Sequence, residues 1–314
     1  MYLEDTYGEE FGSVYRHFPL SFHEHAIITG EATEAAGAQG KFWEMHDLLY
    51  DRQSEWNGLS SDDIPAKLVE YAGQLGLDTE QFARDLEEHI YRDKVVADGE
   101  TAQAARLPGT PSYIINGVLY PTDELGLHPA LVDAFIRVMQ LQPRVHTDIP
   151  PQVIDPDRQY TATIRTDKGD IVIELYAEQA PVTVNSFAFL AQDGWYDGVT
   201  FFRVVPGFVA QTGDPTNTGL GRPGYQCDDE TSPDLRFDAP GVVGMASAGP
   251  GTSTVGSQFF ITYAPLPDLD GNYTVIGRVV EGLDVVESLT ARDPGQNPDL
   301  PPGDTIETVI IEEM

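Results

Sequence analysis

The sequence predicts a multidomain protein, in which a helix-rich α/β domain precedes a mainly-β domain that forms a closed barrel capped by two helices. The chain has 314 residues, which exceeds one typical domain. Residues 141–159 are rich in proline and show no helical periodicity, as is typical of a semi-rigid linker. Apolar residues recur at helical spacing before this segment and alternate as in strands after it. We therefore expect domains at residues 1–142 and 160–314, joined by a linker at residues 143–159.

The first half is predicted to consist of helices framed by short strands. Apolar side chains at amphipathic spacing predict helices at residues 32–50, 64–75, 79–105 and 127–141. Short runs of β-branched and aromatic residues predict strands at residues 13–18, 111–115 and 118–120. Asn116 and Gly117 separate the last two strands, and this dipeptide is typical of a two-residue hairpin turn.

The second half is predicted to be rich in strands. Strands are predicted at residues 160–166, 170–176, 200–205, 207–212, 242–246, 257–263, 273–280 and 305–312, with apolar alternation through Ile171, Ile173 and Leu175. A glycine-containing turn at residues 167–169 joins the first two. Pro181 suits a first helical turn and predicts a helix at residues 182–192, and a second helix is expected at residues 283–289. Many strands with two helices favour a barrel capped at its ends.

The composition limits the classes of partner. The chain has 51 acidic and 18 basic residues, which gives a formal net charge of -33. Such a surface repels nucleic-acid phosphates and anionic lipid, so neither is an expected partner. No apolar run approaches the length of a membrane span, so none is expected in this chain. The first residues show neither a basic region nor an apolar core, so no signal peptide is visible.

Cys227 is the single cysteine of the chain. One cysteine excludes an intramolecular disulfide, a CxxC redox pair and a zinc site with several cysteines. The acidic neighbours at residues 228–230 disfavour a thiolate. We therefore expect Cys227 to be an inert structural thiol.

Four histidines lie close together in the first half of the sequence. They are His17, His23, His25 and His46. Their spacing does not converge with carboxylate or cysteine partners as in known metal sites, so no metal is expected.

Residues 201–214 are the most informative segment for function. They combine one arginine, one glutamine and several aromatic side chains in a run that otherwise has β character. Pro206 and Gly207 turn the chain within this run. A guanidinium held beside exposed apolar side chains suits a site that grips an extended peptide.

This segment resembles the signature of the cyclophilin-type peptidyl-prolyl cis-trans isomerases. Residues 241–250 with 256–262, and then residues 269–282, resemble further blocks of that family in the same order and spacing. The resemblance covers about residues 160–314. It implies a cyclophilin-like barrel that accelerates rotation of X-Pro bonds in unfolded or flexible proline-containing polypeptides during protein folding. It also implies that no cofactor is needed.

Rotation about an X-Pro bond faces a barrier of about 20 kcal/mol because amide resonance gives the C–N bond double-bond character. A catalyst must hold the proline ring in an apolar slot and stabilise the twisted state, in which the nitrogen becomes a hydrogen-bond acceptor. Arginine suits this task because it stays charged and its donors form a rigid fork. This chemistry and the family pattern indicate Arg203 as the catalytic residue, with Gln211 orienting it and binding the substrate backbone.

The resemblance implies the rest of the site. The proline slot is expected to be lined by Phe208, Val209, Phe260 and Leu269, with Tyr273 at its rim. Backbone groups of Ala246 and Ser247 are expected to pair with the extended peptide like an added strand.

Several of these positions depart from the family pattern. Val209 stands where the family often has methionine, and Ser247 where it commonly has asparagine. Asp268 takes the place of a frequent aromatic residue, and Tyr273 that of the site histidine. Because none of these changes removes Arg203, activity is expected to remain, whereas substrate preference and sensitivity to cyclosporin are expected to differ.

The first half resembles the DsbA-type branch of the thioredoxin fold at residues 15–20, 40–46, 75–78 and 109–112. The resemblance implies a cis peptide bond between Thr110 and Pro111. The family's first strand and CxxC pair should lie upstream of these blocks, yet the residues there contain no cysteine. We therefore expect an incomplete, redox-silent DsbA-like domain.

Two histories fit the missing cysteines: loss of the redox centre, or a sequence that begins at an internal methionine of a longer gene. The pairing of the two domains suggests an extracytoplasmic folding role, but the compartment is not predicted. Two other functions stay open. A non-catalytic module that binds proline-containing partners is disfavoured by intact Arg203 and Gln211. A disulfide oxidoreductase would require a true N-terminus upstream.

Overall fold

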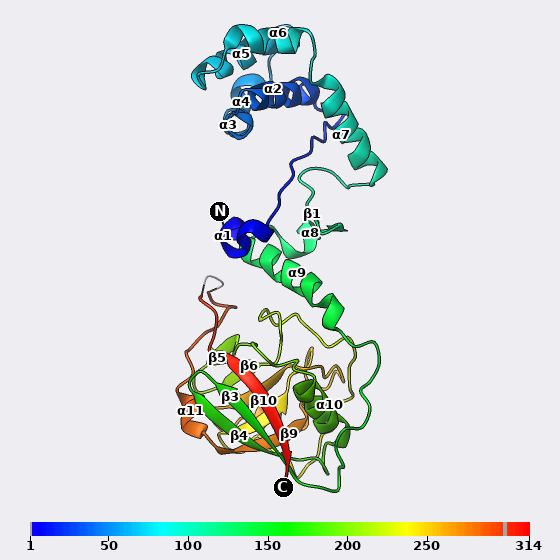
Figure 1. Cartoon of the computed structure of the whole chain (residues 1–314), viewed down its shortest axis with the longest axis vertical. Helices are drawn as coiled ribbons and strands as arrows, with labels where there is room; N and C mark the ends of the chain where they lie inside the picture. The colour runs from blue at the N-terminus through cyan, green and yellow to red at the C-terminus, as the bar shows by residue number, and fades with distance from the viewer. Residues whose placement is uncertain (1, 298–299) are drawn as a thin grey trace. The chain divides into compact units, whose positions relative to one another are not determined.

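The computed structural model describes residues 2–297 and 300–314, and the chain folds into two compact units (Figure 1). The first unit ends at Glu124, and the second runs from Leu125 to Met314. Each unit buries a hydrophobic core of its own. The limits expected from the sequence for the two domains and their linker stay a prediction.

Helices form most of the chain up to residue 125. They are α1 (Tyr2–Tyr7), the 3-10 helix η1 (Gly8–Glu10), α2 (Ala26–Ala38), α3 (Phe42–Asp51), α4 (Gln53–Trp56), α5 (Ile64–Gln74), α6 (Thr79–Glu87), α7 (Arg92–Ala104) and α8 (Thr122–Leu125). The core between α2, α3, α5 and α6 fully buries Met45, Leu68, Tyr71 and Phe82. Among the residues that the structure describes, no helix of the chain combines the length and apolar character needed to cross a membrane.

Two of the long helices expected from the sequence are each divided in two, so these expectations are wrong. The helix expected at residues 32–50 is α2 followed by α3. Gly40 lies between them with a φ of +77°, the left-handed conformation that ends many helices. The helix expected at residues 79–105 is α6 followed by α7, with His89 at a φ of +53° between them. Amphipathic spacing continues across both breaks, so periodicity does not reveal them.

The strand expected at residues 13–18 is also wrong, because this segment is irregular. Its side chains pack onto helices instead. The Tyr15 ring lies edge-on to Phe42 with centroids 5.3 Å apart, and the His17 N–H donates to Asp98 Oδ2 at 3.3 Å. Strand propensity alone does not distinguish aromatic residues that pack onto helices from aromatic residues that belong to a β-sheet.

The hairpin near residue 116 is confirmed. β1 (Ile114–Ile115) pairs with β2 (Val118–Leu119) in the antiparallel sense. Asn116 and Gly117 have φ angles of +47° and +85°, and positive values at both central residues define the favoured hairpin turn. The Thr110–Pro111 peptide bond is cis, as expected from the resemblance.

Strands dominate the second unit and form one antiparallel sheet, in the order β10-β3-β4-β9-β7-β8-β6-β5 (Figure 1). The strands are β3 (Tyr160–Thr166), β4 (Gly169–Leu175), β5 (Arg203–Val205), β6 (Val209–Thr212), β7 (Val242–Met245), β8 (Phe259–Thr262), β9 (Val275–Glu281) and β10 (Ile306–Glu313). The helices are α9 (Pro129–Leu141), η2 (Gln142–Arg144), α10 (Pro181–Gln192), η3 (Pro267–Leu269) and α11 (Leu283–Glu287). Every strand expected in this half is present, with its ends shifted by a few residues.

The sheet curls so that its two edge strands approach each other. In the part of the chain described, β5 and β10 are not paired along their length, but a bridge joins Thr200 to Thr305 just before them. The Phe201 N–H also donates to the Asp304 carbonyl at 2.9 Å. The mainly-β class is therefore confirmed, and these few bonds close the curled sheet.

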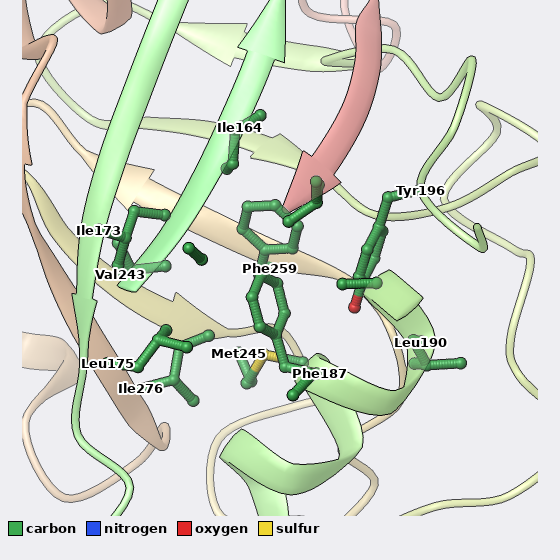
Figure 2. Close-up of a cluster of buried hydrophobic side chains, with 14 of the residues drawn as sticks. Ile164, Ile173, Leu175, Phe187, Leu190, Tyr196, Val243, Met245, Phe259 and Ile276 are labelled. Carbon is green, nitrogen blue, oxygen red and sulfur yellow. The ribbon is translucent and has the colours of Figure 1, made fainter. Parts of the chain in front are cut away.

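The core of the second unit lies between this sheet and α10, as Figure 2 shows. Phe187 of α10 meets Phe259 of β8 with rings 5.4 Å apart and nearly perpendicular. Tyr196 packs against both rings. Ile173 of β4 and Val243 of β7, two strands on either side of β9, belong to the same buried cluster. This packing holds the strands that carry the candidate site.

The proline-rich residues 143–159 pack against the second unit. Ile154 is buried in its core, and its N–H donates to the Asn185 side chain at 3.3 Å. The His146 N–H donates to the Pro223 carbonyl at 2.7 Å. The segment is thus held by specific contacts within the unit that runs from Leu125.

Candidate active site

Four neighbouring strands carry a continuous row of paired residues across the sheet. Arg203 on β5 is the partner of Gln211 on β6, and Gln211 is the partner of Phe260 on β8. Phe260 is in turn the partner of Gly244 on β7. Directly opposite residues in antiparallel strands project to the same face of the sheet. The guanidinium, the amide and the phenyl ring therefore stand side by side on one face.

An apolar cluster lies beside this row. The Phe260 ring stacks on Phe237 with centroids 5.5 Å apart, and it meets the Tyr273 ring at 5.9 Å and 90°. Phe237 is fully buried, whereas Tyr273 is half-buried and lies at the margin of the cluster. The other members that the sequence places at the site are buried Val209 and half-buried Phe208 and Leu269.

Gly244 makes room for the two stacked rings. A Cβ atom at this position would lie 2.7 Å from both Phe237 and Phe260. Real Cβ atoms do not approach carbon atoms so closely, because interiors are packed to contact distance. The two rings can therefore stack here because residue 244 is a glycine, which has no Cβ atom.

Arg203 is held at the edge of this cluster. Its Nε lies 3.6 Å from Asp293 Oδ1, and its guanidinium carbon lies 5.6 Å from the centroid of the Phe208 ring. The side chain is 34% exposed, so its donors reach solvent. The ion pair and the cation–π contact fix the direction of the guanidinium without burying it.

Gln211 is oriented by a second glutamine. Gln211 Nε2 donates to Gln258 Oε1 at 3.1 Å. Gln258 Nε2 in turn donates to the carbonyl oxygens of Gly219 and Gly221, at 2.9 and 3.2 Å. Because its amide nitrogen is engaged in this way, the oxygen of Gln211 is the atom of its amide that can accept a hydrogen bond from a ligand.

The expected backbone contacts of Ala246 and Ser247 are only partly available. The Ala246 N–H donates to the Gln258 carbonyl at 2.8 Å, so it cannot also pair with a peptide. The Ser247 hydroxyl donates to the Gly249 carbonyl. A pocket of about 210 Å³ opens beside these residues and reaches Gln211. A bound peptide would pair through the remaining backbone groups of this segment.

Every residue that the sequence places at the site lies on this row, in its apolar cluster or along the adjoining pocket. Sequence reasoning missed Phe237, Gln258 and Asp293. Gln258 belongs to a block that resembles the family, so its position was a usable signal. Phe237 and Asp293 lie outside those blocks and reach the site through the fold.

Asp268 is exposed in η3, next to half-buried Leu269. The turn that carries both residues is fixed by Asp270, whose Oδ1 accepts the Phe237 N–H at 2.8 Å. The Asn272 side chain donates to the Asp268 carbonyl at 3.1 Å. The carboxylate of Asp268 thus projects from a well-held turn beside the apolar cluster.

Cys227 is buried, with 4% of its surface exposed. Burial raises the pKa of its thiol, and the charges of Glu230 and Asp228 raise it further, against an opposing hydrogen bond from Ser186. The raised pKa agrees with the prediction that the Cys227 thiol resists ionisation. Burial is a larger cause than the acidic neighbours on which the prediction was based.

Three of the four histidines noted in the sequence, His17, His25 and His46, have hydrogen-bond partners within the protein. His17 Nε2 lies 2.9 Å from Glu34 Oε1, and His25 Nε2 lies 2.9 Å from the Leu59 carbonyl oxygen. Over residues 2–297 and 300–314, no group of three histidine, cysteine, aspartate or glutamate side chains is placed to hold a metal ion.

Two family models match the chain. The model described as cyclophilin type peptidyl-prolyl cis-trans isomerase matches residues 161–311. A model described as thioredoxin matches residues 11–129.

Several characterised proteins are similar to the second half. A peptidyl-prolyl cis-trans isomerase of Schizosaccharomyces pombe is 51% identical over 129 residues, which is 40% of this chain and 82% of that protein. The human peptidyl-prolyl cis-trans isomerase-like 1 is 46% identical over 144 residues, 45% of this chain and 84% of its own. Peptidyl-prolyl cis-trans isomerase A of Mycobacterium tuberculosis is 44% identical over 173 residues, 49% of this chain and 90% of its own.

A crystal structure of a cyclophilin type isomerase from Cryptosporidium parvum matches with a TM-score of 0.45 and 35% identity. The match covers 49% of this chain and 98% of that one.

Proposed function

Because this chain belongs to the cyclophilin-type peptidyl-prolyl cis-trans isomerases, we propose that it rotates X-Pro bonds in the groove formed by Arg203, Gln211 and the apolar cluster around Phe260. The isomerase activity acts on proline-containing peptides. The observation that carries the assignment of the site is the row that sets a guanidinium, an amide and a phenyl ring side by side.

Catalysis on this proposal is electrostatic and involves no covalent intermediate. The proline ring sits against Phe260, with Val209 and Leu269 completing the slot. As the amide twists, its nitrogen loses resonance with the carbonyl and becomes a hydrogen-bond acceptor. Arg203 donates to that nitrogen, and the contact is stronger in the twisted state than in either planar state. The barrier falls because only the transition state gains this interaction.

Neighbouring residues hold the reacting groups in place. Asp293 and Phe208 direct the guanidinium of Arg203, so little motion is needed when the amide twists. The oxygen of Gln211 accepts a backbone N–H of the peptide, and Gln258 keeps that oxygen turned toward the groove. The substrate runs as an extended strand past Ala246 and Ser247.

The clients we propose are unfolded or flexible polypeptides, because the groove reads an extended backbone around one proline. For the chain as a whole, we propose an isomerase domain at residues 160–314 and a DsbA-like domain at residues 1–142. The matched ranges 161–311 and 11–129 support these limits.

The experiment is a kinetic comparison of the wild type with Arg203→Ala and Arg203→Lys, using NMR exchange on a short proline peptide. Loss of one charged transition-state contact predicts a fall in kcat/KM of about 100-fold or more for Arg203→Ala. Lysine keeps the charge but not the rigid fork, so its activity should be intermediate. Arg165→Gln is the control, because Arg165 is exposed on β3 and changes the net charge equally.

Circular dichroism should show the wild-type fold in each variant. Wild-type rates in a folded Arg203→Ala protein contradict the assignment of Arg203. A wild-type protein that binds the peptide without accelerating its isomerisation supports the rival view of a non-catalytic binding module.

A further inference from the structure

The pocket of about 210 Å³ beside Gln211 contains a side chain that the mechanism does not use. Most of the pocket is lined by glycine, alanine and serine, so its wall is largely backbone. Arg222 is the charged residue among the lining residues, and it is exposed at the pocket.

Arg222 has no carboxylate partner among the described residues. The chain has 51 acidic and 18 basic residues, and many of the basic side chains form ion pairs, such as Arg278 with Asp238. Within the described residues, Arg222 takes part in no hydrogen bond or ion pair. Its guanidinium donors are therefore available to a ligand.

The loop before Arg222 is held by hydrogen bonds to one buried carboxylate. Asp214 is fully buried, and its carboxylate accepts the N–H groups of Thr216, Gly219 and Gly221 at 2.8, 2.7 and 3.1 Å. A Cβ atom at Gly221 would overlap Asp214 Oδ1, so the loop closes tightly on the carboxylate. The residue that precedes Arg222 is thereby fixed.

The residue that follows Arg222 is fixed as well. Pro223 is buried, and its carbonyl accepts the His146 N–H at 2.7 Å. A Cβ atom at Gly256 would lie 3.3 Å from Pro223 Cδ, so the ring already packs against that wall of the pocket. With its backbone held on both sides, Arg222 presents its charge from a defined point.

The pocket adjoins the place where the X-Pro bond is proposed to rotate. Gln211 and Ala246 belong both to the groove and to the lining of the pocket. An extended peptide advances about 3.3 Å per residue. A side chain one or two residues from the proline therefore reaches the pocket.

We propose that Arg222 is a specificity-determining residue, which selects substrates carrying the carboxylate of Asp or Glu one or two residues from the isomerised proline. The inference rests on the proposed function, because it uses the same groove. A carboxylate matches the planar fork of the guanidinium and can form charge-assisted hydrogen bonds with it. A lysine at the same substrate position is repelled.

The net charge of -33 does not cancel this preference. Repulsion from distant acidic residues is screened over about 8 Å at physiological salt. Arg222 is the charged side chain among those that line the pocket, whereas the buried Asp214 carboxylate behind Gly221 is already engaged by the N–H groups of the loop. Arg222 is therefore the charged group placed to contact a substrate side chain there.

The test is a set of proline peptides that differ only in Glu, Gln or Lys at each of the two positions before and the two after the proline. Glu and Gln have nearly the same shape, so their ratio of kcat/KM reports charge. We expect the wild type to prefer Glu over Gln by about three- to tenfold at one or more positions, with Lys poorest. The preference should shrink in 1 M salt, where the screening length falls to about 3 Å.

Variants assign this preference to Arg222. Arg222→Gln should bring the Glu/Gln ratio to about one, and Arg222→Glu should make Lys the favoured residue. Arg165→Gln removes the same charge from an exposed site on β3 and should keep the wild-type ratio.

The outcomes separate this inference from the proposed function. A wild-type ratio of one at all four positions, with normal turnover of the Gln peptides, overturns the role of Arg222 alone. If a folded Arg222→Gln protein keeps the wild-type ratio of kcat/KM between Glu and Gln peptides, the role of Arg222 is likewise overturned. Failure of the wild type to accelerate any peptide overturns the proposed function, and this inference with it.

Discussion

Arg203 on β5 and Gln211 on β6 are direct cross-strand partners, and Phe260 on β8 extends the same row by one strand. The sheet therefore sets the charged, polar and apolar parts of the candidate site at the spacing of adjacent strands, which is about 4.8 Å. A shift of one residue in the pairing of β5 would turn Arg203 to the opposite face.

The stacked pair Phe237 and Phe260 predicts a strong effect of Gly244→Ala. The added methyl group would overlap both rings, so they must move out of the positions that form the slot. We expect a loss of about 1–3 kcal/mol in stability, as is typical of overpacking, and at least a tenfold fall in kcat/KM. Chemical denaturation and peptide kinetics measure the two effects.

Gly58→Ala is the matched control, because a Cβ atom there meets nothing within 4 Å. Unchanged stability and turnover in Gly244→Ala would show that the rings do not depend on the space at this glycine.

Asp268 predicts weak binding of cyclosporin, a large apolar macrocycle. The resemblance implies an aromatic residue at this position that packs against the inhibitor, whereas an exposed carboxylate must lose hydration without gaining a partner. Asp268→Trp should raise the affinity at least tenfold and leave turnover of a short peptide nearly unchanged. Isothermal calorimetry measures the affinity.

Asp268→Asn removes the charge without adding an aromatic ring, so it separates the two causes. Tight binding by the wild type, or no gain in the tryptophan variant, means that this position does not set the affinity.

Cys227 predicts a redox-silent chain. Because burial raises the pKa of its thiol, little thiolate forms near neutral pH, and a thiol reagent should label the native protein slowly. The unfolded chain should show one reactive thiol. Cys227→Ser should keep isomerase activity, since this residue lies outside the proposed groove. Catalysed reduction of a disulfide substrate by this polypeptide would contradict the expectation.

His17 predicts that the first unit loses stability in mild acid. Burial lowers the pKa of His17 below its ordinary value, although Glu34 opposes the shift. The unfolded chain then binds a proton more readily than the folded chain as the pH falls below about 6.5. The stability contributed by neutral His17 is full above that pH and declines toward the lowered pKa of the folded state.

Pulse proteolysis in urea, with fragments of the first unit identified by mass, gives its stability between pH 5 and 8. His17→Gln should flatten the pH dependence over this window. If the free energy of unfolding changes with pH equally in the wild type and the variant, the pH dependence belongs to other groups.

Local chemistry was sufficient to predict much of the second unit. Alternating apolar residues predict strands such as β4 because the side-chain period of a strand is two. The segment at residues 201–214 predicts Arg203 and Gln211 because its residue types suit the chemistry of a twisted amide and because it resembles the signature of the family. The division of the long helices at Gly40 and His89 was missed, since apolar spacing continues through both breaks.

The partners of the site depend on contacts between distant parts of the chain. Asp293 reaches Arg203, and Phe237 reaches Phe260, only because the sheet curls and brings their loops together. The His146 N–H reaches the Pro223 carbonyl because residues 143–159 pack onto the second unit, so residues expected to form a linker support the pocket of Arg222. A side chain's type and spacing are properties of the sequence, whereas its neighbours across the sheet follow from pairing and packing, which no local pattern records.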